Sequence, residues 1–229
     1  MLCSENTPTY RIRSFIRRQG RLTTGQQMAL DNYWAIYGLD PQVEVDFTRI
    51  FGRDAPLCVE IGFGNGEGLA KMAAANPDIN YIGIEVHRPG VGHLMLQLAQ
   101  QELHNVRIYC HDAIEIMEQR IADHSLTGVH LFFPDPWHKK KHHKRRIVRP
   151  SFVDLLLRKL KSGGYFHAAT DWQHYAEQML AILGSEHGMR NTSRTGDFCE
   201  RPGYRPLTKF EQRGLRLGHG VWDLIFTKI

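Results

Sequence analysis

Short apolar runs recur along the chain and alternate with segments of helical spacing. The runs that read as buried strands are residues 57–61, 81–85, 106–110, 129–133 and 165–170. Apolar residues spaced three and four apart predict helices between them, with one face formed by Leu69, Met72 and Ala73, a second by Leu94, Leu98 and Leu103, and a third by Phe152, Leu155, Leu156 and Leu160. This alternation predicts an α/β domain with a parallel sheet covered by helices on both faces.

The two ends of the chain depart from this alternation. Residues 1–52 precede the first strand and are expected to form a basic arm and a helix at 26–37, so we divide the chain into this arm and a main domain at 53–229. Residues 192–220 are rich in Arg, Gly and polar side chains. The last apolar run, 221–227, predicts an added edge strand, and a further short strand at 189–192 brings the sheet to about seven strands.

Composition narrows the class of protein. The 229 residues are 42% hydrophobic and 23% charged, as in a soluble domain with a substantial core, and the net charge of +5 favours polyanionic partners. The four cysteines form no C-x-x-C pair, so we expect neither a zinc site nor disulfides, and free thiols suit the cytoplasm. No apolar run is long enough to cross a membrane. The Arg-rich stretch 10–21 also has the composition of an organelle transit peptide, so an organelle is the alternative location of the protein.

A glycine-rich loop follows the first strand. Directly after Glu60 come Gly62, Gly64, Gly66 and Gly68, and a strand that ends in glycines lets a ligand approach the backbone closely. The dinucleotide pattern G-x-G-x-x-G fails in both registers, because Glu67 and Leu69 stand where its third glycine is required. A carboxylate in the loop also opposes a pyrophosphate. The loop therefore favours a cofactor with a cationic end, bound by Glu60 and the first three glycines.

Acidic residues end three successive strands of the predicted sheet: Glu60, Glu85 and Asp112. S-adenosylmethionine carries an ammonium and a sulfonium and no phosphate. We expect Glu60 to attract this charge, Glu85 to accept from the ribose hydroxyls and Asp112 to accept from the adenine amino group. Each residue alone has a simpler explanation, Glu85 and Asp112 as helix N-caps and Glu60 as a solvated strand end. Their common position at the ligand-binding edge of the sheet favours the cofactor site.

The fourth strand ends in the segment Leu131-Phe-Phe-Pro-Asp-Pro-Trp137. Two prolines hold the chain rigid around Asp135, and Trp137 adds a flat surface for stacking. A structural turn with a core tryptophan would explain the prolines but not a carboxylate at the cofactor edge. Asp135 is therefore a candidate catalytic residue beside the transferable methyl group.

A basic run follows at 138–149, with seven Lys or Arg residues, three histidines and no acid. Such a run is ordinarily a solvated loop or a targeting tract, but this one adjoins the expected active site and therefore predicts a surface that binds phosphates. No further ligands stand at useful spacing from its histidines, so no metal site is expected. The N-terminal arm adds further basic residues: Arg11, Arg13, Arg17, Arg18 and Arg21.

Taken together, these motifs resemble those of the bacterial tRNA (guanine-N7)-methyltransferase family over essentially the whole chain. The resemblance is carried by Glu60-Ile-Gly-Phe-Gly-Asn-Gly, Phe133-Pro-Asp-Pro-Trp-His-Lys-Lys140 and Thr208-Lys-Phe-Glu211, with Arg13-Ser-Phe and Arg17-Arg-Gln-Gly-Arg-Leu-Thr near the start. It implies a Rossmann-like, seven-stranded class I methyltransferase fold, S-adenosylmethionine as cofactor, and methylation of tRNA at N7 of the variable-loop guanosine, position 46. Family members occur as monomers and as dimers, so the oligomeric state stays open between monomer and homodimer.

The resemblance also implies roles for single residues. Its cofactor contacts match Glu60, Glu85, Asp112 and Asp135, and its proposed catalytic residue matches Asp135. Its substrate-binding positions match Lys139, Asp171, Thr208, Lys209, Phe210 and Glu211. Its RNA-contacting loop matches Lys141, His142, His143, Lys144, Arg145 and Arg146.

The chemistry of N7 limits what the enzyme must supply. This nitrogen carries a lone pair and no proton, so its methylation requires positioning and charge compensation rather than a strong general base. We expect Asp135 to accept from guanine N1–H and the exocyclic amine and to offset the charge that the ring gains. Two alternatives stay open: an RNA-binding module on a methyltransferase-like scaffold, against which the acidic strand ends argue, and a methyltransferase of amines in RNA or protein, whose Asn/Asp-Pro-Pro-Tyr loop the Pro-Asp-Pro-Trp segment faintly resembles.

Overall fold

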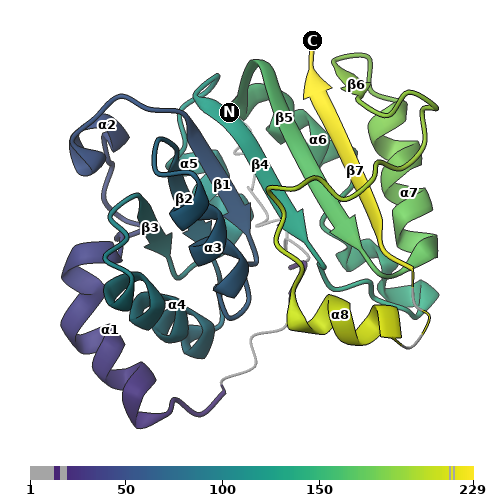
Figure 1. Cartoon of the computed structure of the whole chain (residues 1–229). Helices are drawn as coiled ribbons and strands as arrows, with labels where there is room; N and C mark the ends of the chain where they lie inside the picture. The colour runs from purple at the N-terminus through teal and green to yellow at the C-terminus, as the bar shows by residue number, and fades with distance from the viewer. Residues whose placement is uncertain (1–12, 16–19, 217, 219) are drawn as a thin grey trace, which may run out of the picture.

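The computed structural model describes residues 13–15, 20–216, 218 and 220–229. These residues contain a seven-stranded sheet with the strand order β3-β2-β1-β4-β5-β7-β6 (Figure 1). The strands are β1 (Leu57–Ile61), β2 (Asn80–Ile84), β3 (Val106–Tyr109), β4 (Leu126–Phe132), β5 (Leu160–Thr170), β6 (Met189–Asn191) and β7 (Trp222–Lys228). The first five pair in parallel, and β7 runs antiparallel to β5 and to β6. The expected α/β fold is confirmed.

Two details of the sheet differ from the sequence prediction. Leu160, which we expected on a helix face, instead opens β5 and pairs with Leu126 across a register irregularity. The last strand was expected at the edge, but β7 lies between β5 and β6, and β6 forms the edge. Because β6 has only three residues, it covers β7 over a short length, and β7 keeps the partly exposed pattern that is typical of an edge strand.

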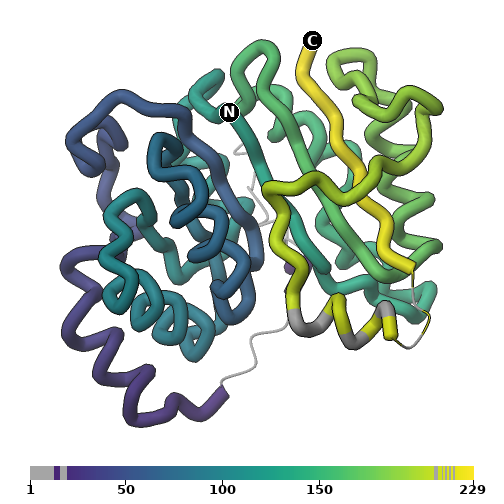
Figure 2. The backbone as a smooth tube through the Cα atoms, viewed as in Figure 1, coloured from purple at the N-terminus to yellow at the C-terminus, as the bar shows by residue number. Residues whose placement is uncertain are grey.

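Helices cover both faces of the sheet, and each face has its own apolar cluster. One face is covered by α1 (Thr24–Tyr37), α3 (Glu67–Ala75) and α4 (Arg88–Gln100). The other is covered by α5 (Ala113–Gln119), α6 (Pro150–Lys159) and α7 (Gln173–Gly184). The tube in Figure 2 shows the chain alternating between the sheet and the helices beside it. This is the layering that alternating strands and helices predict.

The N-terminal segment packs onto the sheet through α1. Thr23 and Gln26 form a capping box at its start, which fits the predicted helix at 26–37, and α1 packs along α4. A short helix that we did not predict, α2 (Phe47–Phe51), is capped by Asp46. Arg11, Arg17 and Arg18 of the expected arm lie outside the described residues, and the division of the chain at residue 52 stays a prediction.

The carboxyl ends of the five parallel strands meet at one edge of the sheet, the lower edge in Figure 1. The helix α8 (Lys209–Arg216) lies at this same edge. In an open α/β sheet, ligands bind outside the carboxyl ends of the strands, where the strand order reverses on either side of β1. None of the helices in the described part of the chain has both the length and the apolar character that crossing a bilayer requires.

Candidate active site

The glycine loop leaves β1 at this edge and turns into α3. Gly62, Gly64 and Gly66 have φ angles of 70°, 61° and 79°, a left-handed backbone that favours glycine. At Gly66, the N-cap of α3, an added Cβ would lie only 2.5 Å from Leu94. At Gly62 and Gly64 an added Cβ would meet nothing within 4 Å. The loop therefore has open space beside its first two glycines, where a ligand can contact the backbone.

Glu60 at the end of β1 is a buried acid. The residue is only 4% exposed, and its Oε2 has no hydrogen-bond partner among the described residues. Burial, and then the nearby charge of Glu85, raises the pKa of Glu60 to about 8. The simpler explanation of a solvated strand end is therefore wrong. An unpaired buried carboxyl suits a cationic ligand, because the cation replaces the solvation that the acid has lost.

Glu85 and Asp112 both accept backbone hydrogen bonds. Glu85 accepts from the N–H groups of Gly64, Val86 and His87 at 2.9, 2.7 and 3.0 Å. It therefore ties the glycine loop to the end of β2. Asp112 is the N-cap of α5 and accepts from two backbone N–H groups at 2.9 and 3.4 Å. The capping explanation is confirmed for Asp112, and a contact of either acid with the cofactor stays a prediction.

The Pro-Asp-Pro-Trp segment is held in a strained turn. Phe133 directly before it and Trp137 at its end have φ angles of 51° and 48°, which cost non-glycine residues about 1–3 kcal/mol each. The turn is fixed at both ends, since the Phe133 N–H donates to Ala169 O at 2.7 Å and Trp137 Nε1 donates to Ser14 O at 3.0 Å. The surrounding structure thus fixes the position of Asp135.

Asp135 is exposed and lies where two cavities meet. The smaller, of about 220 Å³, is bounded by the cofactor loop and the N-terminal segment, with Ser14, Phe15, Gly62, Glu85 and His111 in its wall. The larger, of about 1020 Å³, has Asp171, Trp172, His174, Glu177 and Trp222 in its wall. Phe133, Pro134 and Asp135 line both cavities. One carboxylate thus faces the space beside the glycine loop and a second, larger space at the same sheet edge.

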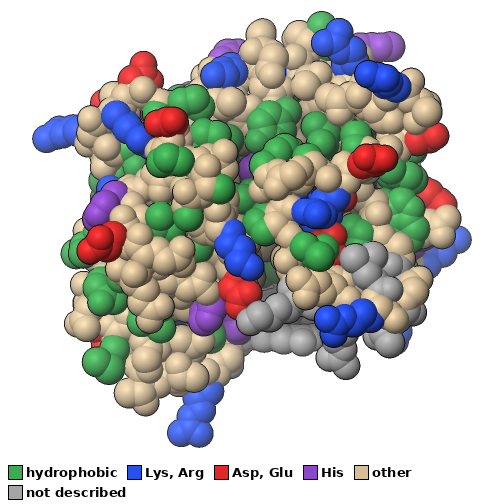
Figure 3. Space-filling view, in the orientation of Figure 1, with side chains coloured by type: hydrophobic (Ala, Val, Ile, Leu, Met, Phe, Trp, Pro, Cys, Tyr) green, Lys and Arg blue, Asp and Glu red, His purple; other side chains and the backbone are tan. Residues whose placement is uncertain are grey.

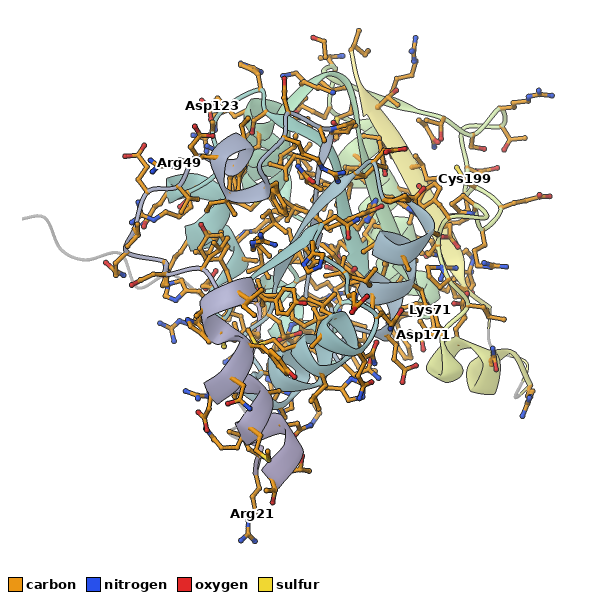
Figure 4. The ribbon with its side chains drawn as sticks, turned by 60° about the vertical axis from the view of Figure 1, so that its left-hand side comes forward. Arg21, Arg49, Lys71, Asp123, Asp171 and Cys199 are labelled. Carbon is orange, nitrogen blue, oxygen red and sulfur yellow. The ribbon has the colours of Figure 1, made fainter. Side chains whose placement is uncertain are left out.

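The expected substrate residues lie on several elements. Asp171 follows β5 and lines the larger cavity, and Figure 4 shows it at the same end of the sheet as α8, whereas Asp123 lies at the other end. Lys139 is exposed at the N-cap of η1 (Lys140–Arg145). Thr208 Oγ1 accepts from the Glu211 N–H at 3.1 Å at the start of α8. The side chains of Lys209 and Phe210 lie outside the described part of the structure.

Glu211 belongs to a buried ionic cluster that the sequence did not reveal. Both of its carboxylate oxygens accept from Arg205 at 2.7 Å, and Arg205 also donates to both oxygens of Asp223 on β7, at 2.7 and 2.8 Å. His167 Nε2 lies 2.8 Å from Asp223 Oδ1. The Arg205 guanidinium lies 5.6 Å from the ring centroid of Phe133. The cluster joins α8 to the sheet and supports the Pro-Asp-Pro-Trp segment. A substrate contact of Glu211 stays a prediction.

The basic run divides into exposed and buried residues. Lys141 and Lys144 are exposed, and His142, His143 and Arg145 are partly exposed. Burial and neighbouring cations, Lys141 beside His142 and Arg146 beside His143, lower the pKa of these two histidines, so both are expected to be neutral at pH 7. On the face drawn in Figure 3 the Lys and Arg side chains are dispersed. Along the sequence, residues 138–149 form the densest basic segment.

Arg146 differs from the rest of the run, because it is only 1% exposed. Its Nε donates to Pro136 O at 2.8 Å, its Nη1 donates to Gln178, and its guanidinium lies 4.6 Å from the ring centroid of Tyr175. Through Arg146, these contacts attach the Pro-Asp-Pro-Trp segment to α7. We expected Arg146 to contact RNA, and the structure corrects this expectation, since a buried guanidinium is not available to a phosphate.

No group of three or more His, Cys, Asp or Glu side chains within the described ranges could hold a metal ion. That the protein needs no metal stays a prediction from the spacing of residues in the sequence.

Comparison with known proteins identifies the family. Residues 54–224 match a family model described as "Putative methyltransferase". The tRNA (guanine-N(7)-)-methyltransferase of Yersinia enterocolitica is 59% identical over 95% of this chain and 92% of its own length, and that of Serratia proteamaculans is 60% identical with the same coverage. Among solved structures, the 16S rRNA methyltransferase KamB superposes with a TM-score of 0.60 at 15% identity, over 82% of this chain and 95% of that one, which supports the class I methyltransferase fold. The chain belongs to the tRNA (guanine-N7)-methyltransferase family.

Proposed function

We propose that this protein transfers a methyl group from S-adenosylmethionine to N7 of guanine in tRNA, and that its target is the variable-loop guanosine at position 46. The observation that carries the proposal is the position of Asp135, which lines both the cavity beside the glycine loop and the larger cavity beside Asp171. A methyl donor in the first and a purine in the second would meet at this carboxylate. Family membership supports the same reaction.

The residues present fit S-adenosylmethionine, which supplies an electrophilic methyl group on a sulfonium. The buried, unpaired carboxyl of Glu60 would attract the cationic end, and the open space beside Gly62 and Gly64 would receive the methionine part. Glu85 and Asp112 end the next two strands and would accept from the ribose and the adenine. Glu85 already holds the loop backbone, so its second function is to keep the loop in its binding conformation.

Asp135 would perform two tasks on the guanine. Its oxygens accept from N1–H and from the exocyclic amine, which fixes N7 toward the methyl group. Its negative charge offsets the positive charge that the ring gains on transfer, and the fixed turn around it makes this stabilisation preorganised. No proton leaves N7, so no general base takes part. Asp171, directly after the neighbouring strand β5, would hold the same base or the flanking nucleotide.

The remaining surface would bind the tRNA backbone. Lys139 and Thr208, together with Lys209 and Phe210, are the proposed substrate contacts. Lys141, His142, His143, Lys144 and Arg145 are the proposed phosphate contacts, without Arg146 because of its burial. We propose that the protein acts on tRNA in the cytoplasm, without a membrane partner.

Nucleoside analysis of tRNA tests the function directly. Bulk tRNA from a strain that lacks this gene should contain no N7-methylguanosine at position 46, and the purified protein with S-adenosylmethionine should restore it. Position-resolved mapping of the modified nucleoside separates this reaction from methylation of an amine and from RNA binding without catalysis. A normal N7-methylguanosine content in the deletion strain, together with no activity of the purified protein, would refute the proposal.

A further inference from the structure

Trp172 combines a fixed backbone with an exposed side chain. Its N–H donates to Thr170 Oγ1 at 3.2 Å, and its carbonyl accepts from the Tyr175 N–H at 2.9 Å at the start of α7. The residue is nevertheless 39% exposed, and it lines the larger cavity together with Asp135 and Asp171. The exposed part of the indole is available to a ligand in this cavity.

The ring of a neighbouring side chain, His138, lies at stacking distance from the indole of Trp172. The imidazole of His138 lies with its centroid 4.1 Å from that of Trp172, at an interplanar angle of 39°. His138 is exposed and belongs to the loop that leads into the basic run. One face of Trp172 is therefore covered by an exposed side chain rather than by packed core, and a planar group that stacks on this face from the cavity would displace His138.

We propose that Trp172 stacks on the face of the target guanine while Asp135 and Asp171 bind the edge of the same base. The inference rests on the proposed function, because it requires the acceptor base to enter this cavity. Guanine presents N–H donors along one edge and a π-face perpendicular to them. The lining of the cavity offers matching features, the carboxylates of Asp135 and Asp171 and the indole of Trp172, with Glu177 and Trp222 as further lining residues.

The stacking partner also bears on the charge of the base. Methylation at N7 turns a neutral ring into a cation, and an indole attracts cations through the negative face of its π-system. Trp172 should therefore stabilise the methylated ring more than the unmethylated one. It follows that the residue favours the charge that develops during transfer and also retains the methylated product.

Kinetics and binding with Trp172→Ala and Trp172→Phe test this inference. Trp172→Ala should lower kcat/KM for tRNA by about 5- to 150-fold, the range that removal of one base–aromatic stack produces, and Trp172→Phe should recover most of the loss. With S-adenosylhomocysteine present, the wild type should bind N7-methylated tRNA about 2- to 30-fold more tightly than the unmethylated transcript. This preference should shrink in Trp172→Ala, a change that a merely structural role would not produce.

Two controls keep the outcomes separate. Trp34→Phe changes a tryptophan on α1, outside the residues that line the cavity, and should leave every readout unchanged. Affinity for S-adenosylmethionine, measured on each variant, reports whether the fold and the cofactor side are intact. If the wild type forms N7-methylguanosine but Trp172→Ala keeps its kcat/KM within twofold and the same product preference, the stacking inference is overturned. If the wild type itself forms none, it is the proposed function that fails.

Discussion

If Glu60 binds the cationic end of the cofactor as proposed, cofactor binding should depend on pH in a defined direction. With a pKa of about 8, Glu60 is mostly protonated at pH 7, and a cationic ligand binds the ionised form. Below that pKa, apparent affinity for S-adenosylmethionine should rise about tenfold per pH unit, because each unit increases the ionised fraction tenfold. At pH 7, binding should release about 0.9 proton per site, provided that the bound carboxyl is fully ionised.

Calorimetry measures both quantities. Titrations between pH 6 and 7.5 give the slope of affinity, and titrations at pH 7 in buffers of different ionisation enthalpy give the number of protons released. Glu60→Gln keeps the shape of the side chain and should remove the proton release and flatten the slope. At pH 7.5 its affinity should be lower by about 1.5–3 kcal/mol, the usual contribution of a hydrogen bond to a charged group. Equal proton release by wild type and variant would refute this account of Glu60.

The same acid should destabilise the free protein at high pH. Its pKa is raised in the folded state from an ordinary value of 4.5 to about 8, so the folded state binds more protons than the unfolded state between these values. The free energy of unfolding should therefore fall as pH rises from about 4.5 to 8, by at most about 5 kcal/mol, and Glu60→Gln should abolish this fall. Urea denaturation across this range, without cofactor, measures it.

Three further variants test the acceptor side. Asp135→Asn should still bind tRNA but reduce single-turnover methyl transfer at saturating S-adenosylmethionine by at least about 10²-fold, and near-normal N7-methylguanosine formation would contradict its role. Neutralising Lys144 and Arg145 should lower the slope of log tRNA affinity against log salt by about 0.7–0.9 for each phosphate interaction removed. Arg146→Gln should leave this slope unchanged and lower the urea midpoint. A lower slope with an unchanged urea midpoint in Arg146→Gln would show instead that Arg146 contacts RNA. Arg205→Met leaves two carboxylates buried without their partner and should cost about 3–5 kcal/mol of unfolding free energy, and a loss below about 1 kcal/mol would argue against the cluster as a support.

The turn of the glycine loop and its place at the sheet edge were predictable because both follow from features that are local in the sequence. The positive φ angles at Gly62, Gly64 and Gly66 follow from a turn that only glycine adopts easily, and strand ends of a parallel sheet meet at one edge whatever the side chains are. The burial of Glu60 was not predictable in the same way. It depends on how closely the neighbouring elements pack around the strand end, which no local pattern records.

The basic run shows how a local pattern misleads. Charge alone grouped Arg146 with Lys144 and Arg145, but its environment is set by Tyr175 and Gln178, about thirty positions further along the chain. One signal was available in the sequence. Arg146 directly precedes the apolar pair Ile147 and Val148, both of which are buried, so the run ends where the chain enters the core. Long basic side chains at such a boundary often lie along apolar surface.

The C-terminal strand has a function beyond extending the sheet. Because β7 lies beside β5 rather than at the edge, its Asp223 can accept hydrogen bonds from Arg205. Arg205 in turn lies against the ring of Phe133 and donates to Glu211. Phe133 is one of the two strained residues that lie on either side of the Pro134–Pro136 turn. A strained backbone persists only where its surroundings impose it, so the buried cluster and the hydrogen bond to β5 together supply that constraint. The position of Asp135 between the two cavities thus depends on residues near the end of the chain. The local sequence around β4 and the Pro-Asp-Pro turn contains no sign of this dependence.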